Sequence, residues 1–184
     1  MLSAWPEADF AILTMIIELA NVGVRPKAIK LTLPPDEIEL DVDGVVLVDD
    51  VEFAGETAKI DEKAHVRGTI TARAKIACIR CLEPVSQKLE IEFDDIFVDA
   101  AEEPSDEELV LEGEDLDQSF VLDGNIDLTE VVREQILLEL PEQLVCREDC
   151  KGLCPKCGSN RNLIDCRCYE DEVDPRWSAL KDLI

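Results

Sequence analysis

The chain has few aromatic residues, no Lys or Arg among its first ten residues, and no long run of apolar residues. Only 4% of its 184 residues are aromatic. A membrane-spanning helix needs about 18 apolar residues in a row, and residues 10–22, which come nearest, are interrupted by Glu18 and Asn21. Residues 1–10 contain no Lys or Arg, so they lack the basic region of a signal peptide. We therefore predict a cytoplasmic protein that does not span or bind a membrane.

Sequence signatures of catalysis are also missing. The eight glycines are scattered, and none forms a GxxxxGK[ST] or GxGxxG phosphate-binding loop. The single histidine, His65, falls in a predicted strand, where we expect it to be solvated. Carboxylates are so numerous that no catalytic pair stands out. These absences predict a protein that is not an enzyme and has no small-molecule substrate.

Basic residues are scarce and unevenly placed. The chain has 18 Lys and Arg against 43 Asp and Glu, a net charge of −25, which repels nucleic acid on average. Residues 63–88 nevertheless contain six basic residues and one acid, whereas residues 89–132 contain 17 acids and no Lys or Arg. The acidic stretch 100–117 is interpreted as a solvated loop. Alternatively, it mimics RNA and binds a basic ribosomal protein, or it masks the basic strip.

The hydrophobic pattern predicts a sheet followed by a helix. Apolar and polar residues alternate from His65 to Ile76 and again from Val85 to Phe93, which is typical of two strands with one buried face each. We expect them to form a hairpin, with shorter extended segments before it. Residues 126–140 have a helical apolar stripe, with Asp127 as N-cap and Glu130 completing a capping box.

The predicted fold class is α+β, with an antiparallel sheet body, one or two packed helices and a cysteine-rich zinc segment towards the C-terminus. The expected boundaries are an N-terminal extension at 1–14, a β-rich body at 15–140 that includes the insert 100–117 and the helix 126–140, a zinc segment at 141–170, and a short docking helix at 171–184.

Six of the eight cysteines lie between residues 146 and 168, and the other two form CIRC at the predicted hairpin tip. The sequence CPKCG has the form of a zinc knuckle, in which two thiolates in a tight turn bind one metal. We predict one or two zinc ions, held by Cys154, Cys157, Cys166 and Cys168 and by Cys78, Cys81, Cys146 and Cys150. Disulfides, an iron–sulfur cluster and a redox CxxC at the hairpin tip are the alternatives.

The basic residues of the hairpin, with one from the knuckle, are candidates for contact with RNA phosphates. An ordinary charged strand face is the competing interpretation. The candidates are Arg67, Arg73, Lys75, Arg80, Lys88 and Arg161.

Several motifs together resemble the YceD family of bacterial and chloroplast proteins over residues 15–184. They are CIRCLEP, IDLTEVVREQILLELP, CREDCKGLCPKCGSNRN with a following CRC, and DPRWSALKDL. The resemblance implies a role in large-subunit ribosome biogenesis and in accumulation of large-subunit ribosomal RNA. From the charge layout, the expected partner is precursor RNA at the basic end or a basic ribosomal protein at the acidic segment. Two alternatives are an acidic protein-interaction adaptor and a thiol- or metal-handling zinc protein unrelated to RNA.

Overall fold

We describe the fold from a computed structural model of the chain, in residues 15–61, 63–100 and 118–168. The predicted N-terminal extension, acidic insert and C-terminal docking helix lie outside these residues. The chain divides into two compact units. The sheet unit comprises Met1–Lys75 and Ser86–Pro141, and the cysteine unit comprises Ile76–Val85 and Glu142–Ile184.

The described strands are β1 (Ile16–Glu18), β2 (Lys27–Leu33), β3 (Val45–Leu47), β4 (Val51–Ile60), β5 (Lys63–Ala77), β6 (Pro84–Asp99), β7 (Gln118–Val121) and β8 (Asn125–Asp127). The α-helix is α1 (Leu128–Glu139), and short 3-10 turns cover Leu19–Asn21, Pro35–Glu37 and Leu122–Gly124. None of the helices in the described ranges is long and apolar enough to cross a membrane.

The sheet unit is built on a mixed sheet with the strand order β2-β4-β5-β6-β7, in which β3 also pairs with β5. β4 is antiparallel to both β2 and β5, whereas β7 runs parallel to β6. β1 and β8 form a separate antiparallel pair. The predicted antiparallel body is therefore confirmed as mostly antiparallel, with β7 as the exception.

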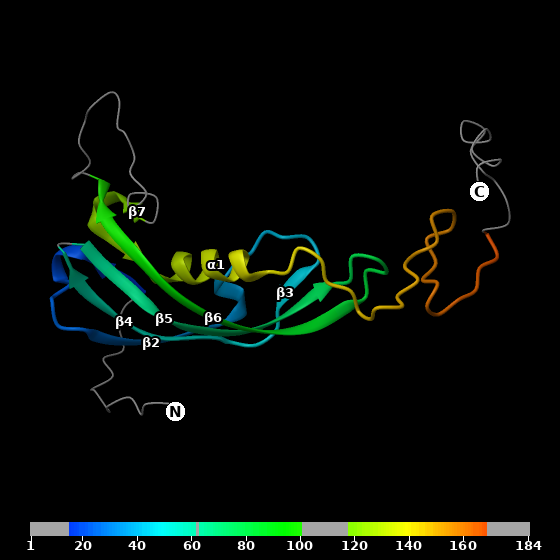
Figure 1. The fold of residues 1–184 in the computed structure, drawn as a ribbon, viewed down its shortest axis with the longest axis horizontal. Coiled ribbons are helices and arrows are strands. Elements are labelled where there is room, and N and C mark those ends of the chain that lie inside the picture. Colours follow the sequence, from blue (N-terminus) through cyan, green and yellow to red (C-terminus); the bar gives the residue numbers. More distant parts are fainter. Residues whose placement is uncertain (1–14, 62, 101–117, 169–184) are drawn as a thin grey trace, which may run out of the picture. The chain divides into compact units, whose positions relative to one another are not determined.

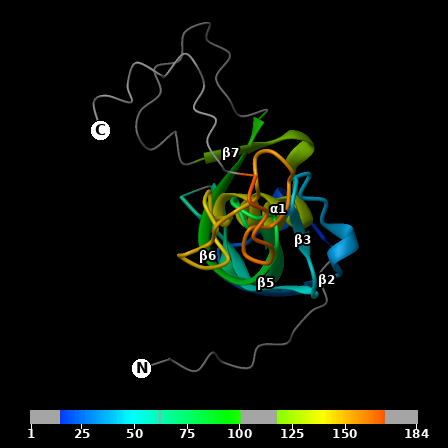
Figure 2. The ribbon, with the colours of Figure 1, turned by 90° about the vertical axis from the view of Figure 1, so that its right-hand side faces the viewer.

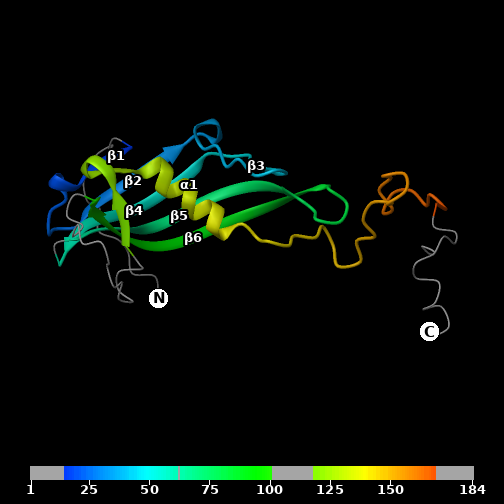
Figure 3. The same cartoon turned by 90° about the horizontal axis from the view of Figure 1, so that it is seen from above.

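The apolar face of the hairpin is buried as the alternation predicts. Val66, Ile70, Ala72 and Ala74 of β5 are at most 3% exposed. Helix α1 lies along one face of the sheet (Figures 1 and 3). Its apolar stripe is buried and consists of Leu128, Val131, Val132 and Ile136. In the end view of Figure 2, β5 and β6 curve around α1. The core of this unit is therefore the space between the sheet and the helix.

The helix begins two residues later than predicted, because residues 125–127 pair with β1 as β8. It ends one residue earlier than predicted, at Glu139. Asp127 is its N-cap and accepts a hydrogen bond from the Thr129 N–H at 2.9 Å. Glu130 does not complete the predicted capping box. Its carboxylate instead accepts a 2.9 Å hydrogen bond from Arg133, the cation one turn along the helix.

His65 is less solvated than we expected. Its side chain is 18% exposed, and its Nδ1 lies 3.3 Å from a carboxylate oxygen of Asp94. A carboxylate on the neighbouring strand β6 therefore faces the histidine on this side of the sheet.

Two glycines face each other across β4 and β5, and they make room for an aromatic ring. Gly55 lies directly opposite Gly68. A Cβ on Gly68 would lie 2.6 Å from the Gly55 Cα and 2.7 Å from the Phe53 ring. That ring is buried and lies 5.6 Å, centroid to centroid, from Phe93. The missing side chains thus allow an aromatic pair to pack on the sheet.

Candidate metal centres

The cysteine unit is held together by backbone hydrogen bonds between the hairpin tip and the segment after α1. The Ile79 N–H donates to the Leu144 carbonyl at 2.9 Å, and the Leu153 N–H donates to the Arg80 carbonyl at 3.0 Å. The Arg80 guanidinium also donates to the carbonyls of Glu148 and Cys150, at 3.1 and 3.2 Å. These bonds align two segments that are about 70 residues apart in the chain.

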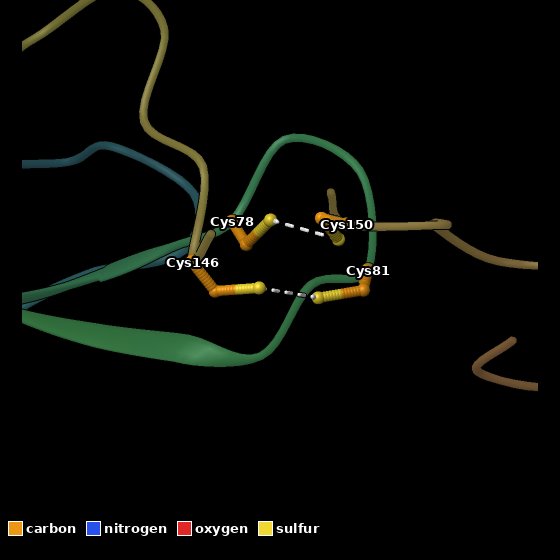
Figure 4. Close-up of side chains that lie close together, drawn as sticks. All are labelled: Cys78, Cys81, Cys146 and Cys150. Carbon is orange, nitrogen blue, oxygen red and sulfur yellow. Dashed lines mark hydrogen bonds between the residues drawn. The ribbon is translucent and has the colours of Figure 1, made fainter. Parts of the chain in front are cut away.

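This alignment brings together the first predicted quartet, Cys78, Cys81, Cys146 and Cys150, which we name the first centre. Its four Sγ atoms lie within 4.8 Å of one another. Figure 4 shows Cys78 facing Cys150 and Cys81 facing Cys146, with Sγ–Sγ distances of 3.9 and 3.6 Å. Sulfurs placed about 2.3 Å from one zinc ion in a tetrahedron would be about 3.8 Å apart. All eight cysteines are free, and the spacing in the first centre fits a shared metal ion.

The second predicted quartet, Cys154, Cys157, Cys166 and Cys168, forms the second centre. Its Sγ atoms also lie within 4.8 Å of one another, and all come from one stretch of 15 residues. This centre is more open than the first, because only Cys154 is buried, whereas Cys78, Cys81 and Cys150 are all buried in the first centre. Both four-cysteine clusters could hold a metal ion.

The two CxxC turns have the same backbone geometry. The N–H of the residue after the second cysteine donates to the carbonyl of the first cysteine, from Leu82 to Cys78 at 2.9 Å and from Gly158 to Cys154 at 2.8 Å. Both residues have positive φ, 61° for Leu82 and 71° for Gly158. The hairpin tip therefore has the same turn as the CPKCG knuckle that the sequence made recognisable.

In the first centre, hydrogen bonds favour the thiolate on two of the sulfurs. Burial tends to raise the pKa of Cys78, but backbone N–H groups, chiefly that of Cys146, lower it to about 6. The pKa of Cys150 is lowered mainly by the Asn162 side chain, whose Nδ2 lies 3.3 Å from the Cys150 Sγ. Burial and the neighbouring sulfurs raise the pKa of Cys146 to about 12. A bound cation would displace the proton that remains on Cys146.

The second centre shows the same division. The pKa of Cys157 is lowered to about 6, first by the Ser159 side chain, whose Oγ lies 3.2 Å from the Cys157 Sγ. The pKa of Cys168 is raised to about 12, first by its hydrogen bond with Cys157. Each centre thus combines a stabilised thiolate with a thiol that would lose its proton to a metal.

The sequence analysis did not single out two residues that lie beside these centres. Asn162 lies between the cysteine pairs of the second centre, yet its side chain serves the first. It donates to the Cys150 Sγ and accepts from the Lys151 N–H at 2.9 Å. Leu82 occupies the position that glycine takes in the other knuckle. In the sequence, Asn162 could have been found from the polar NRN after CPKCG, and Leu82 from its position directly after CIRC.

The candidate RNA contacts lie in varied surroundings. Lys75 is exposed and Arg161 half-buried, and Arg80 donates to backbone carbonyls within the cysteine unit. Three others pair with carboxylates: Arg67 with Glu56, Arg73 with Asp49 at 3.1 Å, and Lys88 with Glu90 at 3.0 Å. Two of these acids come from outside the hairpin, so the strip is less positive than its own sequence suggests.

The fold and the clusters define a mixed-sheet protein with two four-cysteine clusters that could bind metal. The chain belongs to the YceD family, described as "Large ribosomal RNA subunit accumulation protein YceD", whose model matches residues 66–184. The resemblance inferred from the sequence motifs is thereby confirmed. The family name implies a role in accumulation of large-subunit ribosomal RNA, and it denotes an accumulation factor, not an enzyme.

Relatives span bacteria and plants. An uncharacterized protein of Mycobacterium tuberculosis is 30% identical over 181 residues, covering 92% of this chain and 81% of the relative. The uncharacterized protein YlbN of Bacillus subtilis is 33% identical over 117 residues, 63% of each chain. An Arabidopsis thaliana protein named chloroplastic large ribosomal RNA subunit accumulation protein YCED homolog 1 is 26% identical, covering 72% of this chain and 48% of the relative. No solved structure matches the chain.

Proposed function

We propose that this protein is a cytoplasmic, non-enzymatic zinc protein that promotes accumulation of large-subunit ribosomal RNA by binding a basic ribosomal protein of the assembling subunit. The observation that carries the proposal is the pair of four-cysteine clusters. Four thiolates fill the tetrahedral coordination of zinc and leave no open position for a substrate, so each ion is structural. Metal binding then adds to the backbone hydrogen bonds that already connect the loops of the cysteine unit.

Charge favours a basic protein over bare RNA as the direct partner. The chain carries 43 acidic and 18 basic residues, so its long-range field attracts cations and repels phosphate. The described part of the cysteine unit has six basic and five acidic side chains. A zinc ion held by four thiolates carries a net charge of about −2. Two such centres would make this unit negative as well.

The cations of the hairpin supply the competing proposal, in which precursor RNA binds directly to the predicted contact residues. Arg67, Arg73 and Lys88 would first have to release their carboxylate partners. The other candidates are the exposed Lys75, the half-buried Arg161, and Arg80, which donates to backbone carbonyls. Direct RNA binding would weaken steeply as salt rises, because each phosphate contact releases counterions.

Zinc is tested by native mass spectrometry of the protein purified with zinc present. We expect two ions in the wild type and one in each of Cys78→Ser and Cys154→Ser. Protein that retains its fold without metal, or that binds iron and sulfide in place of zinc, contradicts this part of the proposal.

The partner is tested by affinity capture of the tagged protein from lysate, with and without RNase. We expect a basic large-subunit protein to remain bound after RNase treatment. A charge-reversal variant, with Arg73 and Lys75 changed to Glu, should capture it equally well. Loss of all large-subunit components with RNase, or with the charge reversal, would favour direct RNA binding instead.

A further inference from the structure

Leu82 adopts a backbone conformation that its turn would obtain more easily with glycine. In the CPKCG knuckle, the equivalent residue is Gly158, with the same N–H hydrogen bond and a similar positive φ. A left-handed backbone brings the Cβ of any other L-residue close to its own backbone, which is unfavourable for a leucine. The hairpin tip is therefore less stable with leucine at this position than it would be with glycine.

Burial of the side chain does not offset this strain. Leu82 is 62% exposed, so most of its apolar surface faces solvent. Strained backbone positions of non-glycine residues are concentrated at functional sites. The leucine side chain is best explained by a contact made outside the described chain.

Two other exposed aliphatic side chains belong to the same unit as Leu82. Leu163 is 76% exposed and Ile164 is 56% exposed. The Asn160 carbonyl accepts hydrogen bonds from the N–H groups of both, at 3.0 Å each. The Asn160 side chain donates to the carboxylate of Glu83, the residue after Leu82, at 3.3 Å. Asn160 thus links the loop that carries Leu163 and Ile164 to the turn that carries Leu82.

We propose that Leu82, Leu163 and Ile164, here named the apolar patch, are the surface on which a basic protein partner docks through its own apolar side chains. This proposal rests on the proposed function, since it assigns the contact that holds the ribosomal protein. The first centre lies directly beside the patch, because Cys81 is its ligand and Leu82 its neighbour. A metal at that centre would hold the patch rigid, which lowers the entropy lost on binding.

The chemistry of the patch favours a protein over RNA. Proteins bind single-stranded RNA largely by stacking bases on aromatic side chains, whereas the three residues of the apolar patch are all aliphatic. Aliphatic side chains suit the apolar residues of a protein instead. The overall negative charge would attract a basic partner, and the patch would then provide the short-range contact.

The decisive variant is Leu82→Gly, because stability and binding should change in opposite directions. The glycine relieves the left-handed strain, so the thermal midpoint should stay the same or rise. Binding to the RNA-free protein fraction of purified large ribosomal subunits should fall at least tenfold. A lower thermal midpoint with native zinc content would show that Leu82 is structural and would overturn the proposal. Undiminished binding would also overturn it.

A matched pair of charged variants gives a second test. Leu163→Asp should weaken binding to the same fraction, whereas Leu138→Asp should not, since Leu138 is equally exposed, at 78%, but lies on α1 of the sheet unit. Equal effects of the two variants would overturn the patch and leave the proposed partner intact.

Wild-type protein that binds none of the fraction would overturn both the patch and the proposed function. If the patch variants lost binding to a large-subunit RNA fragment but kept the proteins, RNA would be the occupant and the proposal would be wrong.

Discussion

Asn162→Ala should weaken metal binding at the first centre, although Asn162 lies within the sequence of the second. The asparagine donates to the Cys150 Sγ at 3.3 Å and accepts from the Lys151 N–H at 2.9 Å, so both ends of its amide are used. Outer hydrogen-bond partners of metal ligands typically contribute about 10- to 100-fold in metal affinity. Alanine removes both bonds, so we expect a loss within this range.

The structure also predicts how the loss depends on pH. The Asn162 hydrogen bond lowers the pKa of Cys150, and its removal lets protons compete better with the metal. The pH at which half of the first-centre metal is released should therefore rise. Asn162→Asp keeps the acceptor for Lys151 but replaces the donor with a negative charge beside the sulfur. It should weaken binding at least as much as alanine does.

Chelator competition on the zinc protein gives the affinities, and cobalt substitution gives a spectroscopic signature of each thiolate site. Ser159→Ala is the reciprocal control, because Ser159 contacts Cys157 of the second centre. It should weaken the second centre and spare the first. Asn125→Ala, at an exposed asparagine of β8, should alter neither. First-centre affinity that is unchanged in Asn162→Ala, in protein that still binds two ions, would refute the reasoning.

Three further predictions concern the sheet unit. Gly68→Ala should destabilise the fold by about 1–3 kcal/mol, since its Cβ would lie 2.6 Å from the Gly55 Cα; a denaturant melt equal to wild type would contradict this. Asp127→Ala should lower stability by about 1 kcal/mol through loss of the helix cap, again measured by denaturant. Burial raises the pKa of Asp95 despite its bond with Gln135, so the folded state favours the protonated acid and loses stability as pH rises through that pKa. Asp95→Asn should therefore raise the melting temperature at pH 7 but not at pH 3, and a gain at both would contradict the assignment.

The elements that follow local patterns could be predicted from the sequence. Alternation in β5 and β6 predicted the hairpin and its buried face, and Asp127 predicted the start of α1. Spacing also grouped the cysteines of the second centre. These features depend on neighbouring residues or on short-range turn geometry, which the sequence displays directly. The first quartet was predicted only as the four remaining cysteines, and it is the fold that brings its two halves together.

Features that depend on partners from distant segments could not be predicted. The ion pair of Arg67 depends on Glu56, which faces it only because β4 and β5 pair in one register. The parallel strand β7 and the separate β1–β8 pair come from long-range pairing that no local pattern signals. The left-handed Leu82 was missed for a different reason, since leucine is not a residue that predicts positive φ.

The two halves of the first centre are synthesised at different times. The Sγ of Cys81 faces that of Cys146, which comes 65 residues later in the chain. At about 5–20 residues per second, a ribosome needs roughly 3–13 s to add those residues. The hairpin thiols are therefore made seconds before their partners and are exposed in that interval to oxidants and to competing metals. The four cysteines of the second centre are made almost together. In the nascent chain, the thiols at the hairpin tip are therefore exposed to oxidation and to competing metals for longer than those of the second centre.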